Sequence, residues 1–469
     1  MAYRMTGSST LLSSVLFLVV LAANVVAAGQ PFVLEQDDGY RGLWYANQKT
    51  GDAYVYKYSG GMATYPQQHL PIAVHAPAAN KTFFVYGGSP SSDKRTCLHM
   101  VSYFDHSTGA VPRPRILLDK KTDDAHDNPT LAIDRSGHLW VFSNSHGAGR
   151  PSFVHRSVEP YAIDRFELMA TMNFSYGQPW AMDDGSLALM HTRYVQGHRE
   201  MYLATSRDGR EWSDPKPLAR IAQGHYQVSW SDGKRLATAF NYHPVNGGLN
   251  ARTNLYYMQS FDGGQTWTNA GGEPLDLPLE GAQNAALVHD FEAKKKLVYL
   301  KQLQFDDAGR PLILYLTSSG YAPGPANDPR TWCIAEWSGK TWEHRDVTTS
   351  DHNYDYGSLY LEGGLWRLIA PTSPGAQPFG TGGQMEMWTS RDHGAHWEKL
   401  KALTHDEKLN HSYARQPLAA HPQFYAFWAN GDTHRPSESA LFFTDRDGTS
   451  AWRLPGKMDS DAAKPEVAW

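Results

Sequence analysis

The 469-residue sequence has little cysteine and little charge, and each shortage excludes a class of protein. Two cysteines, Cys97 and Cys333, cannot form a disulfide scaffold, and no CxxC motif offers a confident zinc site. Whether these two cysteines pair stays open. The net charge is −5 and charged residues are 19%, so there is no overall basic field to attract nucleic acid. The 41% hydrophobic fraction, with 12% aromatics, excludes a disordered chain.

The one long apolar run lies at the N-terminus. Arg4 precedes an apolar stretch from Leu11 to Ala23, and Val26-Ala27-Ala28 offers small residues for cleavage. The run is short for a bilayer span, so an uncleaved anchor is the weaker alternative. We predict that residues 1–28 are a signal peptide and that residues 29–469 form one catalytic domain. The mature protein would be secreted or periplasmic, without membrane attachment.

A short motif, Ser-x-Asp-(x)-Gly-x-x-Trp, recurs along the chain. Three good copies cover residues 206–212, 260–267 and 390–397, and a weaker fourth covers 444–452. The motif suits a hairpin, because Asp accepts backbone N–H groups, Gly takes a positive φ, and Trp packs beneath the turn. Asp208, Asp262 and Asp392 are therefore predicted to be turn residues rather than catalytic acids.

The spacing of these motifs predicts the number of repeats. Asp208 and Asp262 are 54 residues apart, and Asp392 and Asp447 are 55 apart, whereas the gap between the two pairs holds about two repeats. The segment from Trp332 to Trp342 is the expected remnant of the missing copy. At roughly 60 residues per repeat the chain holds about seven. We predict an all-β fold, a single seven-bladed β-propeller of four-stranded antiparallel blades, with six blades as the alternative.

Three predicted hairpins bring histidine, tyrosine and arginine to one face. A loop–strand–turn–strand unit returns its two ends to the same edge of a sheet, so residues at those ends become neighbours. Chance placement is the alternative, since the chain has 21 histidines. The expected neighbours are His126 with His146, Tyr176 with Arg193, and Tyr226 and His243 with Arg252.

This set of side chains suits β-elimination at a uronic acid. Arg193 or Arg252 would neutralise the carboxylate and the charge that develops beside it. A group among His126, His146 and Tyr176 would take the proton at C5, and a second would protonate the leaving oxygen. These roles require no metal or other cofactor, and no pair of carboxylates suited to ordinary glycoside hydrolysis is evident. Further candidates for substrate binding are Asn128, Tyr226, Tyr242 and His243.

At these residues the chain resembles a group of secreted enzymes. The repeated motif is the Asp box, and together with the segment from His126 to Gly147 it is similar to BNR-repeat seven-bladed propellers that include ulvan lyases and rhamnosyl-glucuronate lyases. Residues 39–45 (GYRGLWY) and 56–61 (YKYSGG) look still closer to a related group acting on L-rhamnose α-1,4-linked to glucuronate. The resemblance covers essentially the whole mature chain. It implies an anionic rhamnose- and uronate-containing polysaccharide as partner, and a monomer.

Carried over to this sequence, the family's histidine pair falls on His126 and His146. Its tyrosine–arginine pair falls on Tyr176 and Arg193, and its second arginine falls on Arg252. Tyr226 competes with Tyr176 for the tyrosine, because the loop between His146 and Tyr176 is harder to align.

The related group also contains inverting α-L-rhamnosidases, which keeps hydrolysis open. The resemblance implies that these enzymes use a histidine on the opposite face, after the YSGG motif, where this chain has His69. A shift of one residue would place Gln68 there instead. A catalytically silent carbohydrate-binding propeller is the alternative from another class. Sialidases share the Asp box, but this chain lacks their Arg-Ile-Pro segment and a clear arginine triad.

Overall fold

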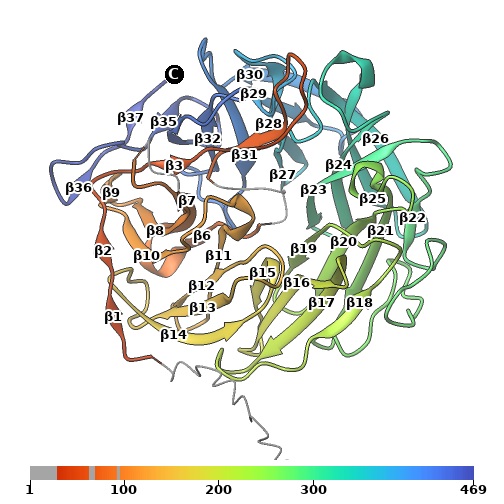
Figure 1. Ribbon diagram of the computed structural model, residues 1–469, viewed down its shortest axis with the longest axis horizontal. Helices are drawn as coiled ribbons and strands as arrows, with labels where there is room; N and C mark the ends of the chain where they lie inside the picture. The colour runs from red at the N-terminus through yellow and green to blue at the C-terminus, as the bar shows by residue number, and fades with distance from the viewer. Residues whose placement is uncertain (1–28, 63–68, 92–95) are drawn as a thin grey trace, which may run out of the picture.

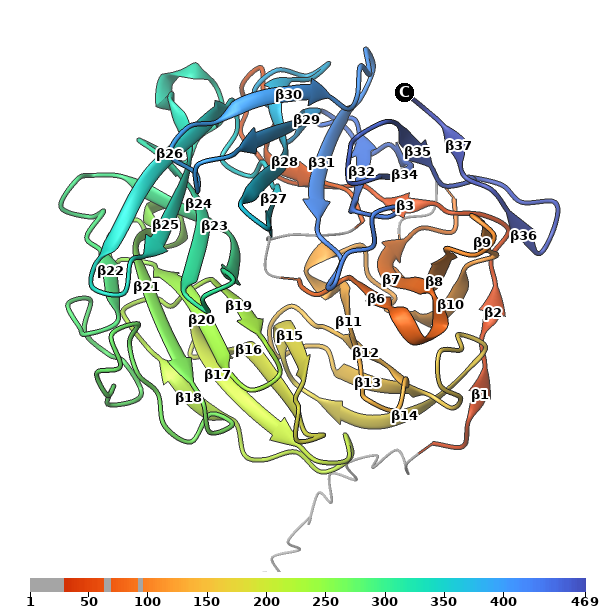
Figure 2. The ribbon, with the colours of Figure 1, turned by 180° about the vertical axis from the view of Figure 1, so that it is seen from behind.

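The structure, a computed structural model, describes residues 29–62, 69–91 and 96–469. Strands dominate, and the sheets follow one another in chain order around a common centre (Figures 1 and 2). The all-β prediction is confirmed. Residues 1–28, predicted to be a signal peptide, lie outside the described part of the chain. The short 3-10 helices are η1 (Pro77–Ala79), η2 (Ala125–Asp127), η3 (Gly248–Ala251) and η4 (Pro325–Asn327).

The N-terminal half of the chain forms four antiparallel sheets. The first contains β6 (Ala73–Ala76), β7 (Lys81–Gly88), β8 (Leu98–Asp105) and β10 (Arg115–Asp119), joined by β2 (Glu35–Gln36), β3 (Gly42–Leu43) and β33 (Glu438–Ser439). The second contains β11 (Pro129–Ile133), β12 (Leu139–Ser143), β13 (Ser152–Ser157) and β14 (Arg165–Met172), joined by β1 (Phe32–Val33). The third contains β15 (Ser175–Ala181), β16 (Leu187–Val195), β17 (His198–Ser206) and β18 (Lys216–Ala219). The fourth contains β19 (Gln227–Ser231), β20 (Leu236–Tyr242), β21 (Thr253–Ser260) and β22 (Leu287–His289).

The chain after His289 forms two larger antiparallel sheets, and two small sheets also use N-terminal strands. One contains β23 (Leu297–Phe305), β24 (Pro311–Ser318), β25 (Arg330–Trp337) and β26 (Trp342–Ser350). The next contains β27 (Ser358–Glu362), β28 (Leu365–Pro374), β29 (Gly383–Ser390), β30 (Glu398–Ala402), β31 (Asn410–Arg415), β32 (Ala426–Gly431), β34 (Leu441–Thr444), β35 (Ala451–Arg453) and β37 (Glu466–Val467). The small sheets pair β4 (Tyr45–Lys49) with β5 (Tyr56–Gly60), and β9 (Val111–Pro112) with β36 (Ala462–Ala463).

The core lies between neighbouring sheets, which explains the apolar runs in the sequence. Strand β24 (PLILYLTS) is buried along nearly its whole length, because both of its faces are covered by neighbouring sheets. The two cysteines lie in different core clusters, Cys97 beside Tyr45 and Tyr58, and Cys333 beside Tyr315. Both are free thiols.

The predicted Asp boxes are structural turns between the third and fourth strands of their sheets. Asp262 Oδ1 accepts a hydrogen bond from Thr266 N at 2.9 Å, and Trp267 Nε1 donates to the Gly264 carbonyl at 3.2 Å. The copies at Asp208 and Asp392 make the same kind of contacts. The fourth copy is shifted, because Asp445 rather than Asp447 accepts the turn N–H groups.

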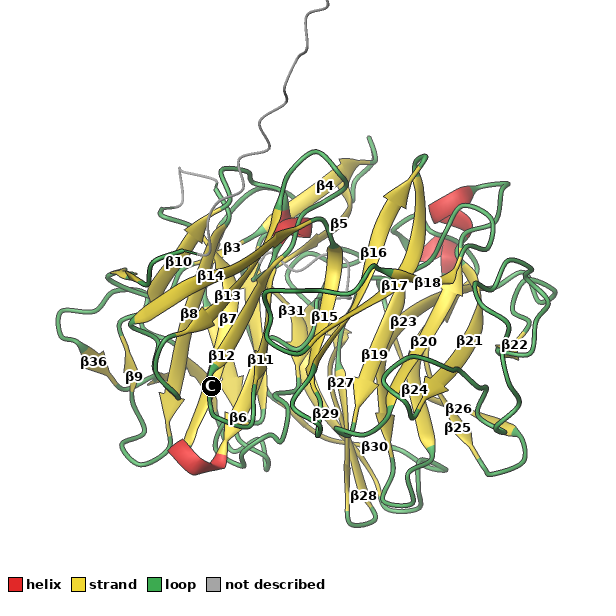
Figure 3. Cartoon of the chain, turned by 90° about the horizontal axis from the view of Figure 1, so that it is seen from below, coloured by secondary structure: helices red, strands yellow, loops and turns green. Residues whose placement is uncertain are grey.

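The two ends of the chain meet within one sheet. Strand β33, near the C-terminus, pairs with β3, near the N-terminus, through Gly42 and Ser439. The hairpin β4–β5 lies at the upper face in Figure 3, where β16 also ends. No helix in the described ranges is long and apolar enough to cross a bilayer.

Candidate active site

A carboxylate holds the two predicted histidines together. His126 and His146 stack with ring centroids 3.9 Å apart and planes 15° from parallel. Asp124 caps helix η2 by accepting the His126 backbone N–H. Its two carboxylate oxygens also bind the Nδ1 atoms of both rings, His146 at 2.8 Å. Because the carboxylate accepts, each Nδ1 carries the proton, and each Nε2 is left with its lone pair.

Electrostatics favour this arrangement at neutral pH. Burial lowers the pKa of His126 to about 4, against the opposing effect of Asp124. Burial alone would raise the pKa of Asp124, but hydrogen bonds from His126 and His146 hold it well below its ordinary value. Asp124 therefore stays ionised beside a neutral His126, and it fixes the tautomer of both imidazoles.

A second buried carboxylate anchors the loop that carries His146. Asp127 accepts the His146 backbone N–H at 2.8 Å and two hydrogen bonds from Arg150 at 2.8 and 2.7 Å. Lys120 lies 3.5 Å from the same carboxylate. A buried carboxylate is tolerated only when it is fully hydrogen-bonded, and Asp127 meets this condition. Its contacts hold the loop in place and so fix the stacked pair of His126 and His146, the histidine platform.

The structure brings Tyr176 to this platform. Its ring centroid lies 6.0 Å from that of His126 and 6.3 Å from that of His146, and only 1% of the residue is exposed. The pairing of β15 with β16 is irregular between Ser175 and Gln178, and Tyr176 has φ = 51°. A non-glycine residue in the left-handed region next to a bulge is a strained conformation that re-aims a side chain.

The arginine beside Tyr176 is Arg199, and the predicted pairing of Tyr176 with Arg193 is not found among the described contacts. Arg193 lies over the ring of Tyr202, 5.5 Å from its centroid. Arg199 lies over Tyr194 and Tyr226, at 5.2 and 5.9 Å. Side chains alternate between the faces of a strand, so Arg193 and its neighbour Tyr194 point to opposite sides. Tyr194 and Arg199 are cross-strand partners, one residue pair away from the turn that joins β16 to β17, and they share a face.

Tyr194 completes this part of the cluster. Its hydroxyl lies 3.1 Å from that of Tyr176, and its ring is 5.7 Å from that of His146. Burial raises the pKa of Tyr194 to about 12, against the opposing charge of Arg199. Both phenols are therefore protonated near neutral pH and can act as O–H donors.

Arg252 is buried in a cage of tyrosines rather than open to solvent. Its guanidinium carbon lies 4.9 Å from the ring of Tyr226, 4.6 Å from Tyr299 and 5.4 Å from Tyr354, and Nη2 donates to the Tyr354 hydroxyl at 2.9 Å. His243 is packed against Tyr226 with ring centroids 4.9 Å apart, as the hairpin argument predicted. Burial, followed by the charges of Arg252 and Arg199, lowers the pKa of His243 well below its usual range.

Two of the predicted binding residues have other surroundings. Tyr242 donates its hydroxyl to Glu292 and lines a separate cavity of about 470 Å³ next to Lys295 and Lys296. Asn128 is buried and its carbonyl accepts from Asn144 at 2.7 Å, which ties the ends of the β11–β12 hairpin together.

His69 does not lie at a separate site on the opposite face. It is fully buried, its Nε2 lies 3.0 Å from the His126 carbonyl oxygen, and its ring is 5.7 Å from that of Tyr176. His69 therefore contacts the same cluster, and its role in an alternative hydrolase site stays a prediction. Gln68 lies outside the described residues.

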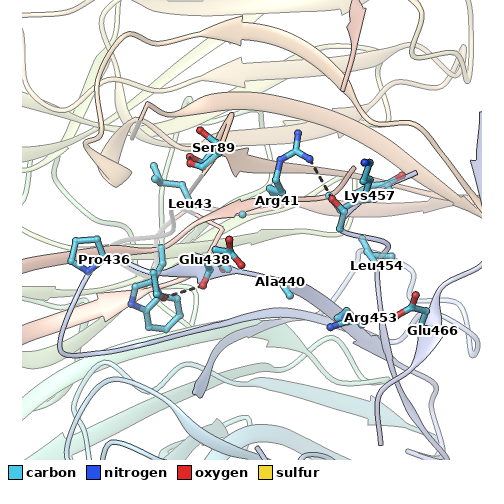
Figure 4. A pocket seen from close by; sticks show the side chains of 17 residues that line it. Arg41, Leu43, Ser89, Pro436, Glu438, Ala440, Arg453, Leu454, Lys457 and Glu466 are labelled. Atoms are coloured by element: carbon cyan, nitrogen blue, oxygen red, sulfur yellow. Dashed lines mark hydrogen bonds and ion pairs between the residues drawn. The ribbon is translucent and has the colours of Figure 1, made fainter. Parts of the chain in front are cut away.

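A cavity of about 500 Å³ lies elsewhere, between β3, β33 and the C-terminal segment (Figure 4). Two of the arginines that line it form ion pairs, Arg41 with Asp38 and Arg453 with Glu466. None of the candidate residues lines it, so the chemistry points to the histidine–tyrosine–arginine cluster instead.

The cluster also contains a potential metal site. Within the described ranges, Asp124, His126 and His146 form the one group of histidine, cysteine or acidic residues whose ligand atoms lie within 4.8 Å of one another. Both Nδ1 atoms already face the Asp124 carboxylate, and a nitrogen that carries a proton cannot bind a metal ion. Asp124 therefore occupies the two Nδ1 atoms, and a metal ion would have to bind through the two Nε2 atoms.

Comparison with known proteins decides the family. A model described as "BNR repeat-containing family member" matches residues 98–350, more than half of the chain. The chain belongs to the BNR repeat-containing family. That match includes His126, His146, Tyr176 and Arg199, so the cluster lies within the part that defines the family.

This BNR-repeat protein is similar to several ulvan lyases. It is 24% identical over 323 residues to an ulvan lyase of Alteromonas sp. (strain LOR), covering 58% of this chain and 64% of the relative. It is 24% identical over 258 residues to one of Nonlabens ulvanivorans, covering 48% and 54%. The alignments thus span less than two thirds of these relatives' lengths.

Solved structures show the same fold. A PL25 ulvan lyase superposes with a TM-score of 0.66 at 16% identity, covering 88% of this chain and 96% of the other. The same type of enzyme bound to -[GlcA(1-4)Rha3S]- gives 0.66 at 17% identity, covering 89% and 96%. The polysaccharide lyase Uly1 gives 0.60 at 12% identity, covering 91% and 100%.

Proposed function

We propose that this BNR-repeat protein is a polysaccharide lyase that cleaves L-rhamnose-α-1,4-D-glucuronate linkages by β-elimination, which breaks the C4–O4 bond of the glucuronate. The observation that carries the proposal is the cluster of His146, Tyr176, Tyr194 and Arg199, in which imidazole, phenol and guanidinium groups face one another. The similarity to ulvan lyases supports the reaction class.

The chemistry assigns each group a role. Arg199 binds the uronate carboxylate, which acidifies C5–H and stabilises the enolate-like charge that develops there. His146 Nε2 takes the C5 proton, because Nδ1 is bonded to Asp124 and the ring is the more exposed of the two histidines. The electron pair forms the C4=C5 double bond as the C4–O4 bond breaks, and Tyr194 donates its proton to O4.

In this proposal Arg252 and Tyr176 do not contact the substrate and act through neighbouring side chains. Arg252 lies in its tyrosine cage, 1% exposed, and its charge acts on the site across the ring of Tyr226. The Tyr176 hydroxyl lies 3.1 Å from that of Tyr194 and can resupply the proton that Tyr194 gives up. His126 stacks on His146 and holds its ring plane.

The same proposal covers the number of blades, the export of the protein, its oligomeric state and its cofactor requirement. We infer a seven-bladed propeller. It is supported by consecutive four-stranded meanders and by the pairing of β29 with β31, which joins the two halves of the nine-stranded sheet at one position only, Gly383 with His411. We also infer export by residues 1–28, action as a monomer on an anionic polysaccharide, and no required cofactor.

Incubation with a rhamnosyl-glucuronate oligosaccharide tests the function. We expect ultraviolet absorbance from an unsaturated uronate, and its loss in His146→Ala. Release of rhamnose without the chromophore would indicate hydrolysis. Binding without turnover on any uronate-containing glycan would indicate a carbohydrate-binding protein.

A further inference from the structure

A third cation, Lys57, lies beside the proposed lyase centre. It belongs to β5 of the hairpin at the upper face in Figure 3, and only 4% of the residue is exposed. Its ammonium donates to Asn250 Oδ1 on helix η3, which immediately precedes Arg252 in the chain. The N-terminal hairpin thus places a positive charge at the edge of the site.

The local charge balance shows that this cation is poorly compensated. Burial, followed by the charges of Arg252 and Arg199, lowers the pKa of Lys57 to about 7. Among the contacts of the described residues, the Lys57 ammonium donates to the neutral side chain of Asn250, and the Arg199 guanidinium lies over the ring of Tyr194. Concentrating buried positive charge without a counter-ion is unfavourable unless an anionic ligand supplies one.

An exposed aromatic ring lies beside this ammonium. Lys57 Nζ is 5.3 Å from the ring centroid of Tyr321, which is 44% exposed, unlike most of the chain's tyrosines. Tyr54, on the same hairpin, packs edge-on against Phe379 with centroids 5.6 Å apart. Aromatic rings with one accessible face are the side chains on which sugar rings pack.

We propose that Lys57 and Tyr321 form a subsite for a second anionic sugar next to the uronate that is cleaved. Tyr321 provides the stacking surface, and the ammonium, which has three N–H donors of which Asn250 takes one, binds the carboxylate or sulfate ester of that sugar. This inference rests on the proposed function and extends it. The protein would favour polyanionic chains over single uronate units.

The test compares Lys57→Met, which keeps the length and removes the charge, with Lys57→Arg, which keeps the charge. Lys49→Met, on the exposed end of the same hairpin, is the matched control. Three probes distinguish the ligand: a rhamnosyl-glucuronate disaccharide, its tetrasaccharide with two uronates, and the disaccharide carrying a sulfate ester on rhamnose. KM and kcat are measured for each, and affinity is measured by calorimetry on the same variants.

We expect Lys57→Met to raise KM about tenfold for the tetrasaccharide, the sulfated disaccharide or both, with kcat and the plain disaccharide little changed. Lys57→Arg should largely restore KM, and Lys49→Met should leave it unchanged. An effect on only one probe identifies the anion. An equal loss on all three probes, or no loss on any, would overturn the subsite. Should turnover be absent in the unmodified protein, the same contrast in calorimetric affinity would still test Lys57.

Discussion

Replacing Asp124 with Asn tests the proposed geometry most sharply, because one carboxylate orients both histidines. The change keeps the shape of the side chain and removes the charge that accepts from the two Nδ1 atoms, one of them at 2.8 Å. An amide can donate to one ring, which permits the wrong tautomer and leaves a proton on the Nε2 that should act as base.

The size of the effect follows from these contacts. A hydrogen bond to a charged group contributes about 1.5–3 kcal/mol. Two such bonds at about 2 kcal/mol each give about 4 kcal/mol of transition-state stabilisation, or roughly a 10³-fold loss of kcat/KM. We expect the loss mainly in kcat, because Arg199 still holds the carboxylate.

The assay is the initial rate of unsaturated uronate formation, with circular dichroism confirming that the variant is folded. Asp123→Asn is the matched control, since Asp123 is the exposed neighbour of Asp124. We expect less than a threefold change for that control. A folded Asp124→Asn variant with the activity of the unmodified protein would refute the role of the carboxylate and the assignment of His146 as base.

Three further predictions concern the arginines, acid stability and the Asp boxes. Arg199→Met should lower kcat/KM about 10²–10³-fold, whereas Arg193→Met should change it less than about threefold. Steady-state rates in the reverse order would indicate that Arg193, not Arg199, binds the carboxylate. Lowering the pH from about 7.5 to about 5 should lower Tm. Burial lowers the pKa of several histidines to about 4 in the folded protein, whereas histidines of the unfolded chain take up protons at about 6.5, so acid favours the unfolded state. A Tm that does not change with pH would contradict this. These histidines are His126, His155, His191 and His225. Trp267→Ala should lower the free energy of unfolding by about 3–5 kcal/mol, measured with denaturant, because Trp267 is 2% exposed. The folded fraction should keep its kcat, because Trp267 belongs to an Asp-box turn and not to the cluster. A loss of kcat in the folded variant would show that this turn is part of the site.

The repeat and the histidine pair could be predicted from the sequence because both depend on local rules. An Asp-box turn is encoded within eight residues, and the copies at Asp262 and Asp392 form as expected. The pair His126 and His146 follows from hairpin geometry, which returns two strand ends to one edge.

The predictions that differ from the structure concern contacts that depend on the direction of a side chain or on a segment far away in the chain. Arg193 and Tyr194 are adjacent, and only the register of β16 with β17 shows that Tyr194 and Arg199 share the site face. The turn Gln196-Gly197 between them was the available signal. His69 was assigned to another face, although its contact with the His126 carbonyl joins segments 57 residues apart.

The missed residues are mostly charged groups that support others. Asp124 and Asp127 lie within two residues of His126 in the sequence, but no local pattern distinguishes a carboxylate that binds two imidazoles from a solvated one. Lys57 reaches Asn250 across 193 residues of chain, a contact that no spacing rule predicts.

Mass spectrometry of the products formed in heavy-oxygen water tests the central claim most directly. Elimination breaks C4–O4 without adding water, so the two products should together have the mass of the substrate and contain no heavy oxygen from the cleavage step. Before interpretation, the slow exchange of the new reducing end with solvent is corrected with a standard of free rhamnose. The account predicts an unsaturated uronate without added water. A saturated uronate and rhamnose that together carry one added water would contradict it.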